Sequence, residues 1–97
     1  KNDKYIVFSG IGNHKTFINM LKKFRFNILK DFEFPDHYKY KNNDINKIIE
    51  KADNLGCKII TTEKDFFRLN GYKMNKIKFI KSELKIVDEE KLINSII

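Results

Sequence analysis

The sequence of 97 residues is long enough for one folded domain with a single core, since 41% of its residues are hydrophobic and nine are phenylalanine. It has no apolar run long enough to cross a bilayer and one cysteine, Cys57, which excludes a disulfide framework or a cysteine-based metal site. Its net charge of +7 would suit nucleic acid or an anionic membrane, but 18 Lys, 15 Ile and 11 Asn are what A/T-rich codons impose on any fold. We therefore attribute most of the basicity to composition, and we expect a soluble chain that is a segment of a longer protein.

The first two elements predicted are a strand and a helix joined by a glycine turn. Tyr5–Ser9 is a short apolar run that ends at Gly10-Ile11-Gly12-Asn13, and Asn13 is a candidate N-cap for the helix that follows. The apolar residues after the turn recur three or four positions apart, as on one face of a helix; they are Phe17, Met20, Leu21 and Phe24. A second strand is expected within Asn27–Phe34, with its apolar residues on one face: Ile28, Phe32 and Phe34.

Pro35 ends that strand because proline has no amide hydrogen to donate, and another helix follows. Asp44 is its expected N-cap, and Gly56 marks its end after a clear apolar stripe. The stripe consists of Ile45, Ile48, Ile49, Ala52 and Leu55. The later elements expected are a strand at 57–62, a short apolar turn through Phe66, Phe67 and Leu69, one or two strands within 77–87, and a last helix from Asp88.

The order of these elements, βαβαβ(α)βα, predicts an α/β fold. We expect residues 1–97 to form one small, three-layer, Rossmann-like domain with a mostly parallel sheet. Parallel strands need crossover connections, and the helices between the strands supply them.

Three polar clusters each follow a predicted strand, and they contain the candidate site residues. The clusters are Gly10-Ile11-Gly12-Asn13, Pro35-Asp36-His37 and Thr62-Glu63-Lys64-Asp65. Because the carboxyl ends of parallel strands lie at one edge of a sheet, the clusters should converge on one cleft, where open α/β sheets bind ligands.

Each cluster has a functional and a structural interpretation. Gly10 and Gly12 could bring backbone donors to a phosphate, but the third glycine of a dinucleotide-binding turn is missing, which favours a purely structural turn. His37 could transfer protons near neutral pH or be a solvated surface residue, and Asp36 could simply bond the donors of its own turn. Thr61–Asp65 could supply hydroxyl groups, a cation and two carboxylates to a site, or it could cap a helix.

Three longer motifs stand in a fixed order along the chain. They are Phe8-Ser9-Gly10-Ile11-Gly12-Asn13 with Phe17, Phe34-Pro35-Asp36-His37 with Tyr40 and Asp44, and Thr61-Thr62-Glu63-Lys64-Asp65 with Arg68. Together they closely resemble the C-terminal third of the tetraacyldisaccharide 4'-kinases, and the resemblance covers nearly the whole chain. The sequence departs from the family where His14 replaces a frequent proline and where Phe66-Phe67 replaces an aliphatic pair.

The resemblance implies a two-domain kinase of lipid A biosynthesis in Gram-negative bacteria, acting at the cytoplasmic face of the inner membrane. Such an enzyme transfers the γ-phosphoryl group of MgATP to the 4'-hydroxyl of tetraacyldisaccharide 1-phosphate. MgATP is then bound mainly by an N-terminal P-loop domain, in keeping with the absence of a G-x-x-x-x-G-K-[ST] motif here. The implied partners are that domain, the lipid disaccharide and, through the full-length enzyme, the membrane surface, but not nucleic acid.

The family also implies that a histidine of the C-terminal domain pairs with a catalytic aspartate of the N-terminal domain. His37 matches that histidine, and Asp36 lies beside it, so we expect these two residues to act in catalysis. The residues expected in the cleft or at the domain interface are Gly10, Gly12, Asn13, Thr62, Glu63, Lys64 and Asp65. No metal site is expected, and the chain alone should be inactive.

Two other interpretations stay open. A stand-alone basic module that binds nucleic acid or anionic lipid would make the lysine excess functional, and salt-dependent binding of random oligonucleotides would identify it. A remnant of a split gene would have only a structural role.

Overall fold

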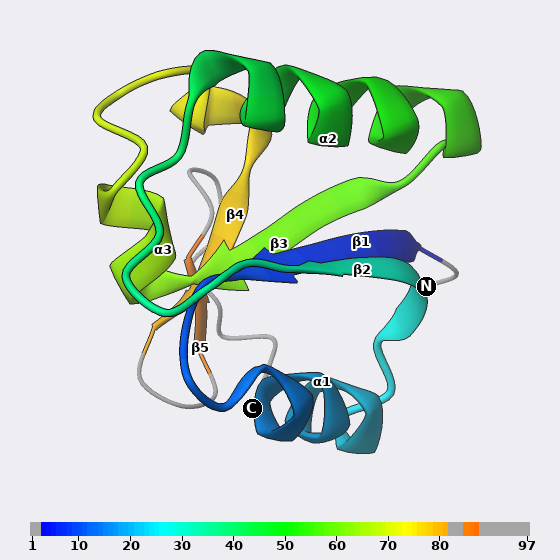
Figure 1. Ribbon diagram of the computed structural model, residues 1–97. Helices are drawn as coiled ribbons and strands as arrows, with labels where there is room; N and C mark the ends of the chain where they lie inside the picture. Colours follow the sequence, from blue (N-terminus) through cyan, green and yellow to red (C-terminus); the bar gives the residue numbers. More distant parts are fainter. Residues whose placement is uncertain (1–2, 82–84, 88–97) are drawn as a thin grey trace.

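Residues 3–81 and 85–87 are described by a computed structural model, in which helices pack on a five-stranded sheet (Figure 1). The elements are β1 (Lys4–Ser9), α1 (His14–Lys23), β2 (Asn27–Glu33), α2 (Asn42–Leu55), β3 (Lys58–Thr62), α3 (Glu63–Phe67), the 3-10 helix η1 (Met74–Lys76), β4 (Lys78–Lys81) and β5 (Lys85–Val87). The last helix expected from Asp88 lies outside the described residues. Within them, no helix has the length and apolar character that crossing a membrane requires.

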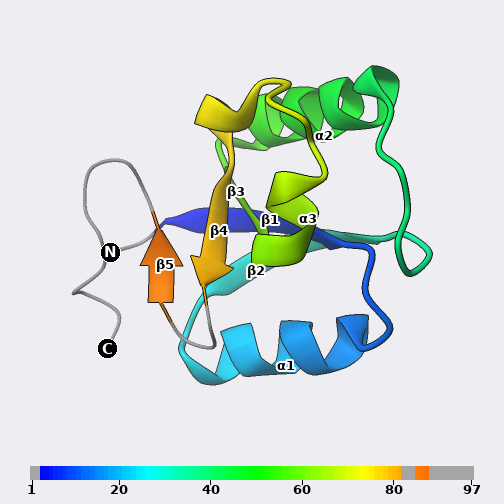
Figure 2. The same cartoon turned by 90° about the vertical axis from the view of Figure 1, so that its left-hand side faces the viewer.

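The strands lie in the order β2-β1-β3-β4-β5. β1 pairs in parallel with β2 and β3, β3 pairs in parallel with β4, and β5 runs antiparallel to β4. α1 covers one face of the sheet and α2 covers the other, as the two views of the ribbon show (Figures 1 and 2). The predicted three-layer, Rossmann-like fold with a mostly parallel sheet is therefore confirmed.

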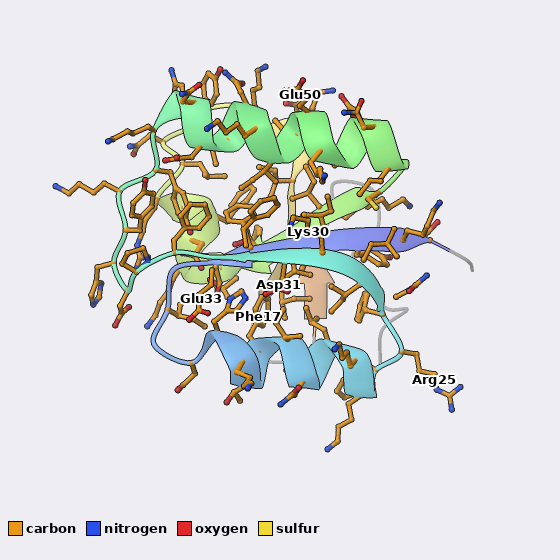
Figure 3. All side chains as sticks on the ribbon, turned by 45° about the vertical axis from the view of Figure 1, so that its right-hand side comes forward. Phe17, Arg25, Lys30, Asp31, Glu33 and Glu50 are labelled. Carbon is orange, nitrogen blue, oxygen red and sulfur yellow. The ribbon has the colours of Figure 1, made fainter. Side chains whose placement is uncertain are left out.

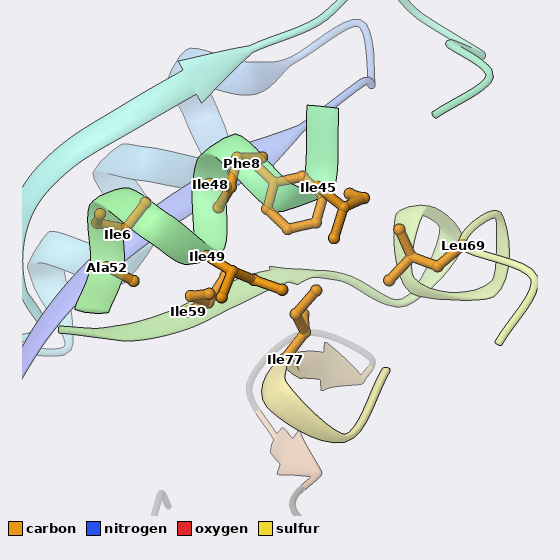
Figure 4. Close-up of a cluster of buried hydrophobic side chains, with 9 residues drawn as sticks. All are labelled: Ile6, Phe8, Ile45, Ile48, Ile49, Ala52, Ile59, Leu69 and Ile77. Carbon is orange, nitrogen blue, oxygen red and sulfur yellow. The ribbon is translucent and has the colours of Figure 1, made fainter. Parts of the chain in front are cut away.

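β1 separates two hydrophobic clusters because its side chains alternate between the two faces of the sheet. Ile6 and Phe8 pack toward α2, whereas Val7 packs toward α1, and all three are fully buried. Figure 4 shows the α2 cluster, which consists of Ile6, Phe8, Ile45, Ile48, Ile49, Ala52, Ile59, Leu69 and Ile77. The α1 cluster consists of Val7, Phe17, Ile18, Leu21, Ile60 and Ile80. A central strand buried on both faces is typical of a parallel sheet covered by helices.

β2 does not have the single apolar face that strict alternation predicts. Its pairing with β1 skips Leu29, which is an extra residue in β2 and forms a bulge. Ile28 therefore packs with the α1 cluster, whereas Phe32 and Phe34 pack with the α2 cluster. Beyond the bulge, Asp31 lies on the α1 side of the sheet (Figure 3).

α2 begins at Asn42, so the prediction that Asp44 is its N-cap is wrong. Lys41 occupies the N-cap position, and the Asp44 carboxylate accepts a hydrogen bond from the Lys41 amide at 2.9 Å. A carboxylate in the first turn satisfies a free amide and complements the helix dipole. At the other end, Gly56 adopts the left-handed conformation with φ 68°, as its place after the apolar stripe predicts.

Replacing Ile48 by Ala should lower the free energy of unfolding by about 2–5 kcal/mol, because the side chain is 1% exposed and its loss would leave a cavity under α2. Leu55 lies on the same helix but is 37% exposed, so Leu55→Ala should cost roughly 1 kcal/mol. Urea unfolding of both variants measures the difference. Equal losses would contradict the packing of α2 on the sheet.

Candidate functional site

The loops that follow β1, β2 and β3 meet at the carboxyl edge of the sheet, on the left of Figure 1. The Gly10 amide donates to the Asp65 carboxylate at 3.0 Å, and the Gly10 carbonyl accepts from the His37 amide at 3.1 Å. The Arg68 guanidinium donates to the same carbonyl at 3.2 Å. The convergence of the three polar clusters, predicted from the geometry of a parallel sheet, is therefore confirmed.

Asp65 is the centre of this edge, and its side chain is fully buried. Its carboxylate accepts hydrogen bonds from the Gly10 amide at 3.0 Å, the Tyr40 hydroxyl at 2.9 Å, the Thr62 hydroxyl at 2.5 Å and Arg68 Nη1 at 3.1 Å. A buried carboxylate is tolerated when it is paired and hydrogen-bonded, and Arg68 supplies the opposite charge. Asp65 therefore acts as a structural hub and does not face the solvent.

Thr62 caps α3, because its Oγ1 accepts from the Asp65 amide at 3.1 Å. For Thr62, the helix-capping interpretation of the third cluster is therefore the correct one. Lys64 is exposed and Glu63 is partly buried on the first turn of the same helix. Neither side chain forms a hydrogen bond or ion pair with any residue of 3–81 or 85–87.

Gly10 is required by the close approach of the neighbouring loop. A Cβ on Gly10 would lie 2.9 Å from the Pro35 carbonyl oxygen and 3.2 Å from the Tyr40 hydroxyl. The Gly10 amide is bound to Asp65, so it is not available to a phosphate group. These contacts support the structural interpretation of the glycine turn.

Gly12 and Asn13 are exposed on the outer part of this turn. A Cβ on Gly12 would lie 3.7 Å from Asp36 Oδ2, so the first and second clusters are neighbours here. Asn13 occupies the N-cap position of α1 as predicted, but its side chain makes no capping hydrogen bond. Its backbone carbonyl instead accepts the first helical bond, from the Phe17 amide at 3.1 Å.

His37 lies on a turn with φ 62°, a conformation that residues other than glycine rarely adopt. Its side chain is 79% exposed, and its Nε2 is 3.8 Å from Asp36 Oδ1. Its Nδ1 lies 3.4 Å from Arg68 Nη2. Arg25, Asn70 and Lys73 also have positive φ, so this conformation defines a turn and does not by itself mark a site.

Aromatic rings hold the loop after β2 on the sheet. Tyr38 stacks on Phe34 with centroids 4.8 Å apart, and Tyr40 meets Phe8 edge-on at 5.4 Å. Burial raises the pKa of the Tyr40 hydroxyl well above its ordinary value, and the charge and hydrogen bond of Asp65 raise it further. Tyr40 therefore stays protonated and remains a hydrogen-bond donor to Asp65.

A hollow of about 480 Å³ opens beside His37. It is lined by His37, Tyr38, Lys39, Tyr40, Phe67, Arg68 and Asn70. The lining combines two cations with aromatic rings, and the Phe67 ring is 61% exposed. Such a surface suits a ligand that carries both negative charge and flat apolar faces.

A second polar chain, which the sequence did not predict, joins β1, α1 and β2. Ser9 Oγ is 2.6 Å from His14 Nδ1, and His14 Nε2 is 2.6 Å from Asp31 Oδ2. Ser9 and His14 are buried and Asp31 is 45% exposed, so this chain runs from the interior to the surface and fixes the start of α1 against the sheet. The departure from the family at His14 was its only signal in the sequence, because the approach of Asp31 depends on the bulge in β2.

Among residues 3–81 and 85–87, no group of three or more His, Cys, Asp and Glu side chains could hold a metal ion. The Gly10 amide, which a phosphate at this turn would need, is bound to Asp65. The described residues therefore contain neither a three-ligand magnesium site nor a free Gly10 amide for a phosphate group.

The fold and this edge place the chain in the class of open α/β domains whose ligands bind at the carboxyl ends of parallel strands. The family model for tetraacyldisaccharide-1-P 4'-kinase matches residues 1–97, so the chain belongs to that family.

Three curated relatives are each named tetraacyldisaccharide 4'-kinase. The protein from Pelagibacter ubique is 50% identical over 97 residues, which are 100% of this chain and 31% of that protein. The proteins from Rickettsia typhi and Rickettsia akari are 40% and 37% identical over 89% and 77% of this chain, and over 26% and 23% of their own lengths. The chain thus spans less than a third of the curated relatives that it matches. No solved structure matches it significantly.

Gly10→Ala should destabilise the protein by about 1–3 kcal/mol, because the new methyl group would overlap the Pro35 carbonyl at 2.9 Å. Gly12→Ala is the matched control on the same turn, and it should change stability by less than about 0.5 kcal/mol because its Cβ has a clearance of 3.7 Å. Thermal unfolding compares the two variants. Equal stability of both would refute the tight packing of the loops around Gly10.

Proposed function

We propose that this chain is the C-terminal domain of a tetraacyldisaccharide 4'-kinase, which transfers the γ-phosphoryl group of ATP to the 4'-hydroxyl of tetraacyldisaccharide 1-phosphate in lipid A biosynthesis. Family membership and the names of the relatives support this activity. In the proposed enzyme, an N-terminal P-loop domain of the same polypeptide binds MgATP. The small share of its relatives that the chain spans, 31% of the first, is consistent with such a domain. The full-length enzyme would act at the cytoplasmic face of the inner membrane.

The observation that carries a catalytic role for this domain is the position of His37. Its imidazole is exposed at the point where three loops are hydrogen-bonded together, and its backbone is bonded to the Gly10 carbonyl. An exposed side chain on a fixed turn can reach a group on another domain without rearrangement of its own domain.

The proposed role of His37 follows from the chemistry of the reaction. A hydroxyl nucleophile needs a positioned base, and phosphoryl transfer depends mainly on positioning and charge. In the proposed enzyme, a carboxylate of the N-terminal domain is that base, and His37 forms a hydrogen bond that orients it. Asp36, whose Oδ1 lies 3.8 Å from His37 Nε2, is the second residue of this chain that we propose to act in catalysis.

The other candidate residues divide into a frame whose members are hydrogen-bonded to one another and a set of residues around it. Gly10, Thr62 and Asp65 build the frame through their mutual hydrogen bonds. The residues that we propose for contact with the N-terminal domain or the substrate are Gly12, Asn13, Glu63 and Lys64.

In the full-length protein that contains this chain, His37→Ala should lower kcat by roughly 10²- to 10⁴-fold. The KM for ATP should change little, because the nucleotide is bound elsewhere in the proposed enzyme. The melting temperature should stay the same, since truncation of an exposed side chain typically costs under about 0.5 kcal/mol. Steady-state kinetics and thermal unfolding of the same variant measure these effects.

Lys47→Ala, a change of an exposed residue on α2, is the control for this comparison. A fall of both kcat and melting temperature would make His37 a structural residue. Unchanged kinetics would reject the catalytic assignment.

A further inference from the structure

Arg68 connects His37 to the buried carboxylate of Asp65. Its Nη1 donates to Asp65 Oδ1 at 3.1 Å and to the Gly10 carbonyl at 3.2 Å. Its Nη2 lies 3.4 Å from His37 Nδ1. The two terminal nitrogens of one planar guanidinium are therefore divided between the buried frame and the exposed imidazole.

The chemistry of arginine determines the direction of the contact with His37. A guanidinium group has only donors and stays protonated, so His37 Nδ1 is the acceptor. A neutral imidazole that accepts at Nδ1 carries its hydrogen at Nε2. The contact with Arg68 therefore leaves an N–H donor on the ring nitrogen that Arg68 does not touch.

The ring of His37 depends on Arg68 for its orientation because it is mostly exposed and packing does not hold it. Asp36 Oδ1 is 3.8 Å from Nε2, which is beyond hydrogen-bond distance. The His37 amide and Arg68 Nη1 both donate to the Gly10 carbonyl. The backbone of His37 therefore contacts this carbonyl directly, and its ring is connected to it through Arg68.

We propose that Arg68 is a positioning residue for His37, which sets the ring orientation and the Nε2–H tautomer that His37 presents to its partner carboxylate. The inference rests on the proposed catalytic role of His37. Arg68→Lys tests it, because this change keeps a positive charge for Asp65 but replaces the forked group by a single nitrogen. A single ammonium nitrogen on an unforked side chain should not keep both the Asp65 and the His37 Nδ1 contacts where the two guanidinium nitrogens make them.

The kinetic test uses the full-length protein that contains this chain. Arg68→Lys should lower kcat on the order of 10- to 100-fold with little change in the KM for ATP, because a misplaced group loses its catalytic geometry. Arg25→Lys is the matched control, since Arg25 is exposed on a turn that points away from the site (Figure 3). It should leave both constants unchanged.

A double-mutant cycle separates positioning from a purely structural role. If Arg68 acts through His37, Arg68→Lys should cause no further loss of kcat in the His37→Ala background. A full additional loss there would overturn the proposal. So would wild-type kcat in the single variant Arg68→Lys.

Nitrogen-15 NMR of the histidine-labelled full-length protein supplies a measurement that does not depend on activity. Neutral His37 should show an unprotonated Nδ1 in the wild type and a mixture of tautomers in Arg68→Lys. An identical spectrum in the variant would overturn the proposal even if kcat fell. Should His37→Ala retain full activity, the proposed catalytic role of His37 fails, but the spectrum still decides whether Arg68 orients the ring. If Arg68→Lys has a lower melting temperature than the wild type, both spectra are recorded at a temperature at which both proteins are folded.

Discussion

One buried charge holds the candidate site together. The Asp65 carboxylate accepts hydrogen bonds from Gly10 after β1, from Tyr40 after β2, and from Thr62 and Arg68 at the two ends of α3. Burial of an ionised carboxylate costs several kcal/mol unless its oxygens are bonded, and here a guanidinium and three neutral groups bond them. Because the donors come from separate loops, none of these loops can shift without leaving a buried polar group without a partner.

This frame explains how an exposed histidine can have a defined geometry. The side chain of His37 is mostly exposed, but its amide donates to the Gly10 carbonyl and its ring contacts Arg68. Gly10 and Arg68 are in turn both hydrogen-bonded to Asp65. Buried residues of the three clusters, such as Asp65, thus fix the positions of the loops. Exposed residues, such as His37, present their side chains to the surroundings. Such a division is what the proposed reaction between this chain and a second domain would require.

The sequence predicted the elements and their convergence, because hydrophobic periodicity and the geometry of a parallel sheet are local or general rules. It did not predict contacts that depend on a single irregularity. The extra residue Leu29 reverses the faces of β2, which sends Ile28 to the α1 cluster and brings Asp31 to His14. Asp65 and Lys64 are adjacent charged residues in a polar cluster, and nothing in the sequence shows which of them is buried. Only the tertiary structure distinguishes the buried Asp65 from the exposed Lys64.

The organising role of Asp65 is tested most directly by amide hydrogen exchange and urea unfolding of Asp65→Asn, which removes the charge at nearly constant shape. We expect the free energy of unfolding to fall by about 3–5 kcal/mol, because Arg68 would lose its buried counter-charge and the amide nitrogen that replaces one carboxylate oxygen would donate where that oxygen accepted. Exchange of the Gly10 and His37 amides should accelerate more than exchange in the middle of α1. Unchanged stability together with unchanged exchange at both amides would contradict the view that Asp65 holds the three loops in place.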